Sequence, residues 1–237
     1  MAGNGLHIHS RLLKDGANVL MEKGKLSDSA RKMIGGYLHL APSLTSFGNI
    51  IPTSYFRLVP DQEAPTRICW GDRNRSTLIR VPLGWVGEVN MAKVANPKEP
   101  GSEMKDGQRQ TVEYRGADGS ADVYLLMAGL AVAARYGLEW NDSLKYTEKT
   151  YVDVNIYKEK NHKRADKLLR LPASCWESAE ALQSQKSIYT DYGVFSEGMI
   201  SSIIRHLKSF DDKNLRSEIA DNEEEIQKLV EKYFNCG

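Results

Sequence analysis

The sequence contains few cysteines and no long hydrophobic run. Cys69, Cys175 and Cys236 are far apart in the 237 residues and form no CxxC pair. They exclude a disulfide framework and a zinc knuckle, and they fit a reducing cytosol. The longest apolar run, Val123 to Ala134, is too short to cross a bilayer, and no secretory signal follows Met1. We therefore expect a cytoplasmic protein without a membrane partner.

The sequence also has no excess of charge of either sign. There are 32 basic and 31 acidic residues, so the formal net charge is +1. Such a balance gives no overall attraction to nucleic acid, and any electrostatic effect must be local. Hydrophobic residues make up 41% of the chain and charged residues 27%, which predicts a folded core in one large domain or two small ones.

The first residues lead directly into a predicted strand, Leu6 to Leu13, that carries His7 and His9 on one face. A strand with two histidines rarely opens a domain, so we expect the chain to begin within a larger protein. The pair could ligate one metal or contact phosphates, although two surface histidines are the more common meaning of an isolated HxH. Asp15-Gly16 predicts a hairpin turn, with Asn18 to Met21 as the returning strand.

Helical spacing recurs in several later segments of the chain. Ser27 can cap a helix that continues to Phe47 and is interrupted at Pro42. A second helix, Ala121 to Tyr136, is apolar nearly all round and is expected to be buried, with Ser120 as its cap. Further predicted helices begin at capping residues in the last third of the chain, at Ser174, Ser196 and Asn222.

The stretch Gly107 to Leu125 has Glu113 and Arg115 at its centre. Strand alternation places Thr111, Glu113 and Arg115 on one face. A carboxylate beside a guanidinium can hold a cation and an anion together, as phosphoryl chemistry requires. A cross-strand ion pair on a solvated face is the alternative, and this stretch alone favours it.

Two further segments carry charged groups in suggestive positions. Predicted strands at Thr66 to Trp70 and Thr77 to Val81 flank a turn, and Arg73, Arg75 and Arg80 around it predict a phosphate or carboxylate site. The segment from Ile51 to Gln62 is predicted to be irregular, and the loop that holds Arg57 and Glu63 between prolines is either a substrate flap or an ordinary connector. The long segment from Leu83 to Gln110 has no assigned role.

Four segments of the chain stand out together and occur in this order: Gly3-Asn4-Gly5-Leu6-His7-Ile8-His9, Arg57-Leu58-Val59-Pro60-Asp61-Gln62-Glu63-Ala64-Pro65, Arg73-Asn74-Arg75-Ser76-Thr77-Leu78-Ile79-Arg80-Val81-Pro82 and Val112-Glu113-Tyr114-Arg115. Together they resemble the carboxyl-terminal catalytic half of glutamine synthetase. The resemblance covers residues 3 to about 138 well and the helical tail more loosely. It implies an α+β fold in which antiparallel strands form part of a curved barrel with flanking helices, as in guanidino kinases.

The resemblance implies an enzyme that makes glutamine from glutamate, ammonia and ATP through a γ-glutamyl phosphate. It implies that His7 ligates the metal bridging the ATP phosphates and that Glu113 ligates the metal nearer to glutamate. Mg²⁺ or Mn²⁺ suits such a mixed oxygen and imidazole site. By the same resemblance His9, Arg75 and Arg80 would contact ATP, with Arg75 nearest the transferring phosphoryl group.

The remaining implied roles concern glutamate and ammonia. Arg57 and Arg115 would hold glutamate carboxylates, and the backbone of Gly3 would contact the same substrate. Glu63 would close the site and help to deprotonate ammonium, so the resemblance makes Glu63 and Arg75 the catalytic residues.

Several positions depart from the family pattern. Ala2 stands where asparagine is usual, Arg11 where serine is usual, and Gln108 near an expected lysine. The family's amino-terminal β-grasp domain and its first glutamate ligands are absent, and in the family the site lies between subunits. We therefore expect this chain to be inactive alone and the full-length protein to form a ring-type homo-oligomer.

The expected organisation is the second half of a catalytic barrel at residues 1–138, with a helical tail at 139–237 packed on the same domain. Two rival functions remain open. One is a ligase that joins glutamate to another amine, and the other is a non-catalytic family member that binds nucleotide or assembles into rings. Neither rival involves a nucleic acid.

Overall fold

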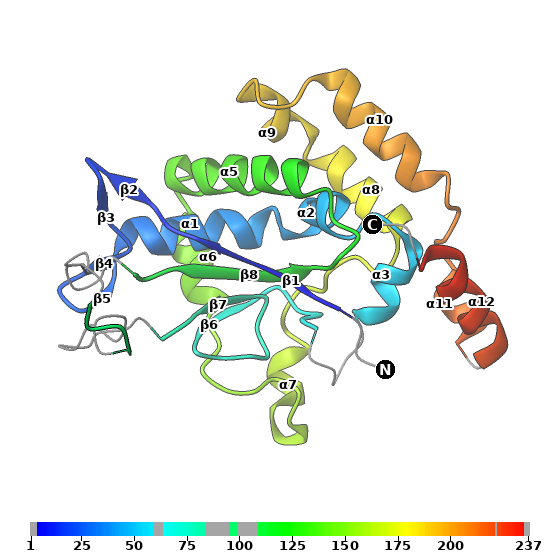
Figure 1. Ribbon diagram of the computed structural model, residues 1–237, viewed down its shortest axis with the longest axis horizontal. Coiled ribbons are helices and arrows are strands. Elements are labelled where there is room, and N and C mark those ends of the chain that lie inside the picture. The colour runs from blue at the N-terminus through cyan, green and yellow to red at the C-terminus, as the bar shows by residue number, and fades with distance from the viewer. Residues whose placement is uncertain (1–3, 59–63, 84–94, 99–108, 221, 235–237) are drawn as a thin grey trace.

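The computed structural model describes residues 4–58, 64–83, 95–98, 109–220 and 222–234 (Figure 1). Four strands form its main sheet, in the order β1 (Leu6–Ser10), β8 (Val112–Ala117), β7 (Ile79–Val81) and β6 (Trp70–Asp72). β8 is antiparallel to both of its neighbours, whereas β6 is parallel to β7. Helices beside a mostly antiparallel sheet confirm the expected α+β class. Within the described residues this sheet is open, so the part of a barrel that was predicted does not close.

Helices α1 (Asp28–His39) and α2 (Ala41–Gly48) pack against this sheet. The Ser27 hydroxyl accepts a hydrogen bond from the Ala30 amide, as the predicted cap requires. Pro42 lies in the first turn of α2, where a missing amide hydrogen costs nothing, so the predicted interruption is a break between two helices. The prediction of an irregular segment after Ile51 is wrong in part, because Pro52 begins a short helix, α3 (Pro52–Arg57).

Two small hairpins follow β1 before the first helix. Asp15 and Gly16 have φ values of 52° and 77°, which is the turn geometry that the Asp-Gly pair predicts. Lys23 and Gly24 repeat that geometry, with φ of 49° and 76°, in a second hairpin that the sequence reading missed. The strands are β2 (Leu13–Lys14), β3 (Ala17–Asn18), β4 (Met21–Glu22) and β5 (Lys25–Leu26).

The long helix α5 (Val123–Glu139) crosses α1 at very short range. A Cβ atom added to Gly36 would lie 2.0 Å from the Ala133 carbonyl oxygen, and one added to Gly137 would lie 2.2 Å from the Lys32 oxygen. Glycine on both helices therefore permits the contact.

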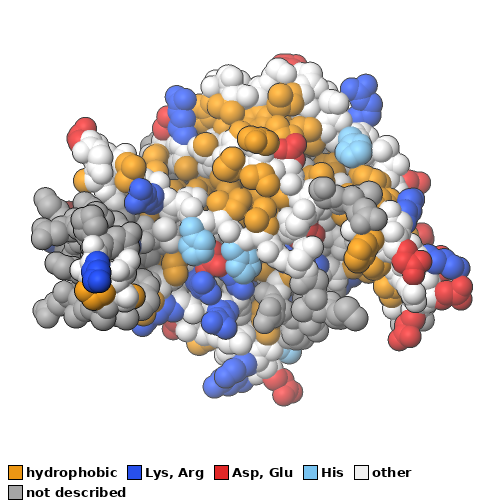
Figure 2. Space-filling model, viewed as in Figure 1, with side chains coloured by type: hydrophobic (Ala, Val, Ile, Leu, Met, Phe, Trp, Pro, Cys, Tyr) orange, Lys and Arg blue, Asp and Glu red, His pale blue; other side chains and the backbone are white. Residues whose placement is uncertain are grey.

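Two expectations for α5 were wrong. Its cap is Asp122, which accepts from the Leu125 amide, whereas the Ser120 hydroxyl donates to Asp118. The helix is also not buried all round, because Tyr124 is 83% exposed and Val123 and Met127 are exposed beside it. In Figure 2 apolar side chains gather on the face of the molecule where α5 lies.

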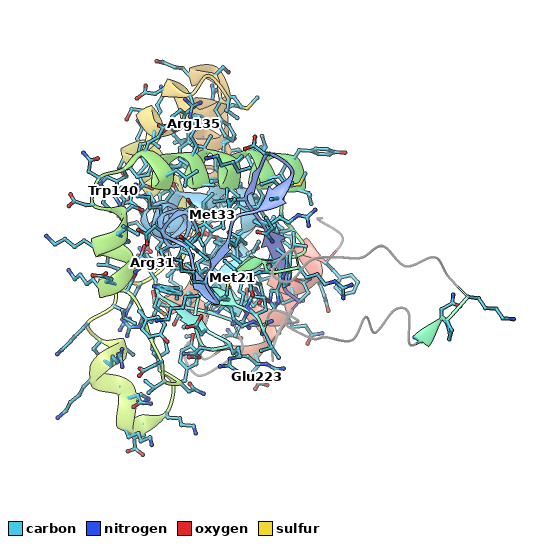
Figure 3. The ribbon with its side chains drawn as sticks, turned by 90° about the vertical axis from the view of Figure 1, so that its left-hand side faces the viewer. Met21, Arg31, Met33, Arg135, Trp140 and Glu223 are labelled. Atoms are coloured by element: carbon cyan, nitrogen blue, oxygen red, sulfur yellow. The ribbon has the colours of Figure 1, made fainter. Side chains whose placement is uncertain are left out.

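The remaining helices are α6 (Ser143–Lys149), the 3-10 turn η1 (Glu159–Asn161), α7 (His162–Ala165), α8 (Cys175–Ser184), α9 (Lys186–Asp191), α10 (Glu197–Lys208), α11 (Leu215–Ile219) and α12 (Glu223–Tyr233). Helices α8, α9 and α10 continue the main hydrophobic core, whereas Ala165 of α7 packs in a second small cluster with Cys69, Val152 and Ile156. The buried members of the main core run from Leu20 to Leu207 and include Phe47, which stacks on Phe195 at 5.2 Å between ring centroids. The division of the chain into a catalytic part, residues 1–138, and a helical tail, residues 139–237, stays a prediction. Arg31, labelled in Figure 3, reaches from α1 to α6, where its Nη1 lies 3.8 Å from Glu148 Oε1.

The three predicted caps in this last part are confirmed. Ser174, Ser196 and Asn222 each accept a hydrogen bond from the amide three residues later. No helix among the described residues is long and apolar enough to span a membrane.

Candidate active site

Glu113, at the middle of the central strand β8, is the centre of the site. Its side chain is 1% exposed, so its charge depends on close partners. The strand register supplies them, because His9 on β1 and Arg80 on β7 both pair directly with Glu113. Three strands thus bring an imidazole, a carboxylate and a guanidinium into one row across the sheet. Figure 2 shows histidine side chains beside acidic and basic ones on this open face.

Distances within the row are short. His7 Nδ1 lies 3.0 Å from Glu113 Oε1, and His9 Nε2 lies 4.0 Å from the same oxygen. Arg80 Nε lies 2.5 Å from the other carboxylate oxygen, Oε2. His7 and His9 are 41% and 46% exposed, so the imidazoles form the solvent side of a buried carboxylate. Thr111 lies on the same face as Glu113, as predicted, because its Oγ1 is 2.9 Å from Nδ1 of His9, which also faces Glu113.

The electrostatics of His7 reflect this crowding. Partial burial lowers the pKa of His7 below its usual value, and the positive charge of Arg115 lowers it further, while Glu113 raises it. A neutral imidazole is the form that can donate a lone pair to a metal ion. The environment therefore favours the ligating form of His7.

Arg115 is buried beside the row. Its Nε lies 3.7 Å from Glu113 Oε1, and its Nη1 donates to the Arg75 and Thr77 carbonyl oxygens. The side chain therefore ties β8 to the loop that carries Arg75. Arg75 itself is exposed, and it makes no ion pair with any residue that the structure describes.

Arg57 comes to the same region from the end of α3. Its Nη2 donates to the Gly116 and Ala117 carbonyl oxygens at 2.7 and 3.0 Å. Burial lowers the pKa of Arg57, and the Asp118 carboxylate opposes that effect. A Cβ added at Gly5 would lie 3.4 Å from His7 Nε2 and 3.7 Å from Arg57 Nη1, so both groups border the same glycine.

The structure thus brings together seven of the nine predicted site residues. Gly3 and Glu63 lie outside the described residues, as does most of the segment from 83 to 110. Of the three arginines predicted to bind an anion, Arg73 instead lines a separate hollow with Trp70. The residues brought together are His7, His9, Arg57, Arg75, Arg80, Glu113 and Arg115.

Asn74 is a site residue that the sequence reading missed. Its amide donates to the Val152 and Val154 carbonyl oxygens, at 3.1 and 2.8 Å. Its oxygen accepts from the amide and hydroxyl of Ser76. Asn74 thereby fixes the loop on which Arg75 lies. An Asn two residues before a Ser in a turn is a known local pattern that could have indicated this role.

The donor set fits part of a divalent-cation site. Glu113 Oε2 is buried and has Arg80 Nε beside it without a well-aligned hydrogen bond, and His7 Nδ1 is close to the other oxygen. No group of three or more His, Cys, Asp or Glu side chains within the described ranges could hold a metal by itself. Mg²⁺ and Mn²⁺ need about six ligands, so the remaining ones must come from elsewhere.

The balance of charge indicates an anionic ligand. Arg80 and Arg115 lie against the carboxylate of Glu113, and Arg57 acts on the neighbouring His7, with Asp118 acting on Arg57. Such an excess of buried and half-buried guanidinium groups, with the exposed Arg75 on the adjoining loop, favours carboxylate or phosphate groups. The fold and the site define an α+β protein that can bind an anion and a cation side by side.

Comparisons with known proteins identify the family. A family model described as "Glutamine synthetase, catalytic domain" matches residues 1–227. The chain is 37% identical over 187 residues to the glutamine synthetase of Pyrococcus furiosus, which covers 78% of this chain and 37% of that protein. It is 34% identical over 217 residues to that of Thermococcus kodakarensis, with 88% and 43% covered. The chain belongs to the glutamine synthetase family, as the four segments predicted.

A solved structure agrees with this fold. The structure described as "Apo GmaS without ligand" aligns with a TM-score of 0.64 and 22% identity, covering 87% of this chain and 41% of that chain. At this identity the likeness concerns the fold alone. The chain spans about two fifths of the length of the curated relatives that it matches.

Proposed function

We propose that this chain is the carboxyl-terminal part of the catalytic domain of a glutamate–ammonia ligase. The full protein would make glutamine by phosphorylating the side-chain carboxylate of glutamate with ATP and then replacing phosphate with ammonia. The observation that carries the proposal is the row of His9, Glu113 and Arg80 with arginines around it. Both reacting groups are anions, so their approach requires this concentration of positive charge.

The exposed and half-buried cations would bind the phosphate groups of ATP. Arg75 is held by its backbone and has an unengaged side chain within the described structure, so it can follow a phosphoryl group as charge develops. Arg80 and His9, at either side of Glu113, would neutralise the other ATP phosphates. His7 and Glu113 would hold Mg²⁺ or Mn²⁺, which supplies Lewis-acid stabilisation of phosphate oxygens when bound.

The buried arginines would bind the glutamate substrate. Arg57 and Arg115 donate to backbone carbonyl groups, which fixes each guanidinium before a substrate arrives. Each would bind a glutamate carboxylate. Gly3, through its backbone, and Glu63, as the group that deprotonates ammonium, complete the proposed site.

Other parts of the full protein would complete the site. A cation held by His7 and Glu113 needs further carboxylate ligands, and none lies close enough within the described ranges. We propose that they come from the rest of the polypeptide and that the protein works as a ring-type homo-oligomer in the cytoplasm. The exposed apolar residues of α5, Val123, Tyr124 and Met127, support burial in such an assembly.

The test uses the polypeptide that carries this chain in full. ADP release and glutamine formation are followed with glutamate, ATP and Mg²⁺, with and without ammonium. We expect ADP release to depend on ammonium, and Arg75→Ala to lower kcat at least a hundredfold with little change in the KM for glutamate. Release that requires a different amine would reassign the acceptor. Unchanged turnover in Arg75→Ala would refute the role of that residue.

A further inference from the structure

A hollow of about 620 Å³ lies between α6 and the η1–α7 segment, away from the row on β8. None of its lining residues belongs to the site described above. In Figure 3 the segment around α7, at the lower left, extends side chains with nitrogen tips into solvent. Five of the lining residues are basic, namely Lys149, Lys160, Lys163, Arg164 and Lys167.

Neutralising partners for these cations are few. Arg164 Nη1 pairs with Asp153 at 2.7 Å, and its Nη2 donates to the Tyr151 carbonyl oxygen. The single carboxylate in the lining, Glu148, is turned partly towards Arg31 on α1. No described residue forms an ion pair with any of the four lysines, all of which are exposed. The net charge of the whole chain is only +1, so this local excess is not a property of the overall composition.

The hollow has a firm wall. Val152 is buried with Cys69, and the Tyr151 ring packs against Trp70 with 4.9 Å between ring centroids. Asn161, at the rim, donates to the Asn155 carbonyl oxygen at 2.7 Å and holds the η1 turn. The lysines therefore project around a fixed concave floor, which suits a compact ligand better than an extended strand of nucleic acid.

We propose that this hollow is a second anion site, and that it binds a small molecule carrying two or more phosphate groups. Each lysine is a compact point charge with three donors, and several such groups around one concavity suit a pyrophosphate unit. Binding such an anion also removes the repulsion among the lysines. The phosphates could belong to inorganic pyrophosphate or to a nucleoside diphosphate, whose ring system could lie on the floor formed by Tyr151 and Leu168.

The experiment measures binding of inorganic pyrophosphate by calorimetry, without divalent cations, to the polypeptide that carries this chain in full. Lys160→Gln combined with Lys163→Gln should weaken binding about tenfold, because the variant removes two of the charges around the hollow and solvent screens each of them. The matched control combines Lys145→Gln with Lys158→Gln. These lysines neighbour the same two elements but do not line the hollow, so binding should not change.

Arg75→Gln separates this site from the proposed active site. Pyrophosphate should still bind to the hollow in the Arg75→Gln variant, with the same affinity as in the parent chain. Equal losses in the two lysine double variants, or loss of all binding in Arg75→Gln, would overturn the proposal.

Titration with ADP distinguishes a nucleotide from pyrophosphate by tighter binding. A twenty-nucleotide RNA that binds more tightly than either, and loses affinity equally in both double variants, would instead assign a nucleic-acid surface. Thermal unfolding confirms that each variant is folded.

Discussion

Replacing Glu113 with Gln should destabilise the chain, even though the substitution changes one charge and almost no volume. Glu113 lies 2.5 Å from Arg80 Nε and 3.7 Å from Arg115 Nε. Removing one partner of a buried ion pair costs about 3–5 kcal/mol, because the burial of the other charge is no longer offset by that attraction. Arg80 is partly exposed and can regain water, so we expect about 2–3 kcal/mol.

Urea unfolding followed by tryptophan fluorescence measures this loss. With an m value near the upper end of the usual range, about 3 kcal/mol/M, the midpoint should fall by about 1 M. Glu139→Gln is the matched control, because Glu139 forms the same kind of pair with Arg135 at 2.9 Å but on an exposed surface. That control should lose much less stability, because solvent screens an exposed ion pair. Equal midpoints for Glu113→Gln and the parent chain would refute the argument, since they would mean that the cost of burying the Glu113 charge is as large as its attraction to the arginines.

Two further predictions concern other parts of the chain. Gly36→Ala should lower the thermal midpoint by several degrees or prevent folding, because a Cβ there would lie 2.0 Å from a carbonyl oxygen on α5. Gly198→Ala, where no atom lies within 4 Å, should be tolerated, and an equal loss in both would contradict the packing argument. Burial lowers the pKa of His39, which packs on Tyr136 and Trp140. Because the unfolded chain then binds a proton that the folded chain does not, stability should fall as the pH drops below about 6.5. His39→Gln should show a smaller fall than the parent chain between pH 7.5 and 5.5 in urea unfolding, and an identical fall would contradict the assignment.

The sequence predicted local features of the site better than their arrangement. Alternation correctly placed Glu113 and Arg115 on one face, because the period of a strand is fixed by its backbone. The direct pairing of Glu113 with His9 and Arg80 could not be read, because register between distant strands depends on the whole sheet. The resemblance to a family supplied the connection that the pattern lacked.

Helix α5 shows why composition misled. A helix that is apolar all round usually lies in a core, yet one side of α5 leaves Tyr124 in solvent. The sequence records how apolar a helix is, but not which of its sides the rest of the chain covers. The cap of the same helix was misplaced by two residues because Ser120 has a competing partner in Asp118.

The row across β1, β8 and β7 has a consequence for how the chain acquires its site. His9 and Thr111, joined by a hydrogen bond, are 102 residues apart in the sequence. No short segment contains the row, so it exists only after three distant segments have docked in register. Contacts of such long range slow folding, because loop closure precedes any gain from the contact. An anion or cation that binds across the three strands would therefore stabilise the pairing of all three. Molecules able to bind it would form only at the end of folding.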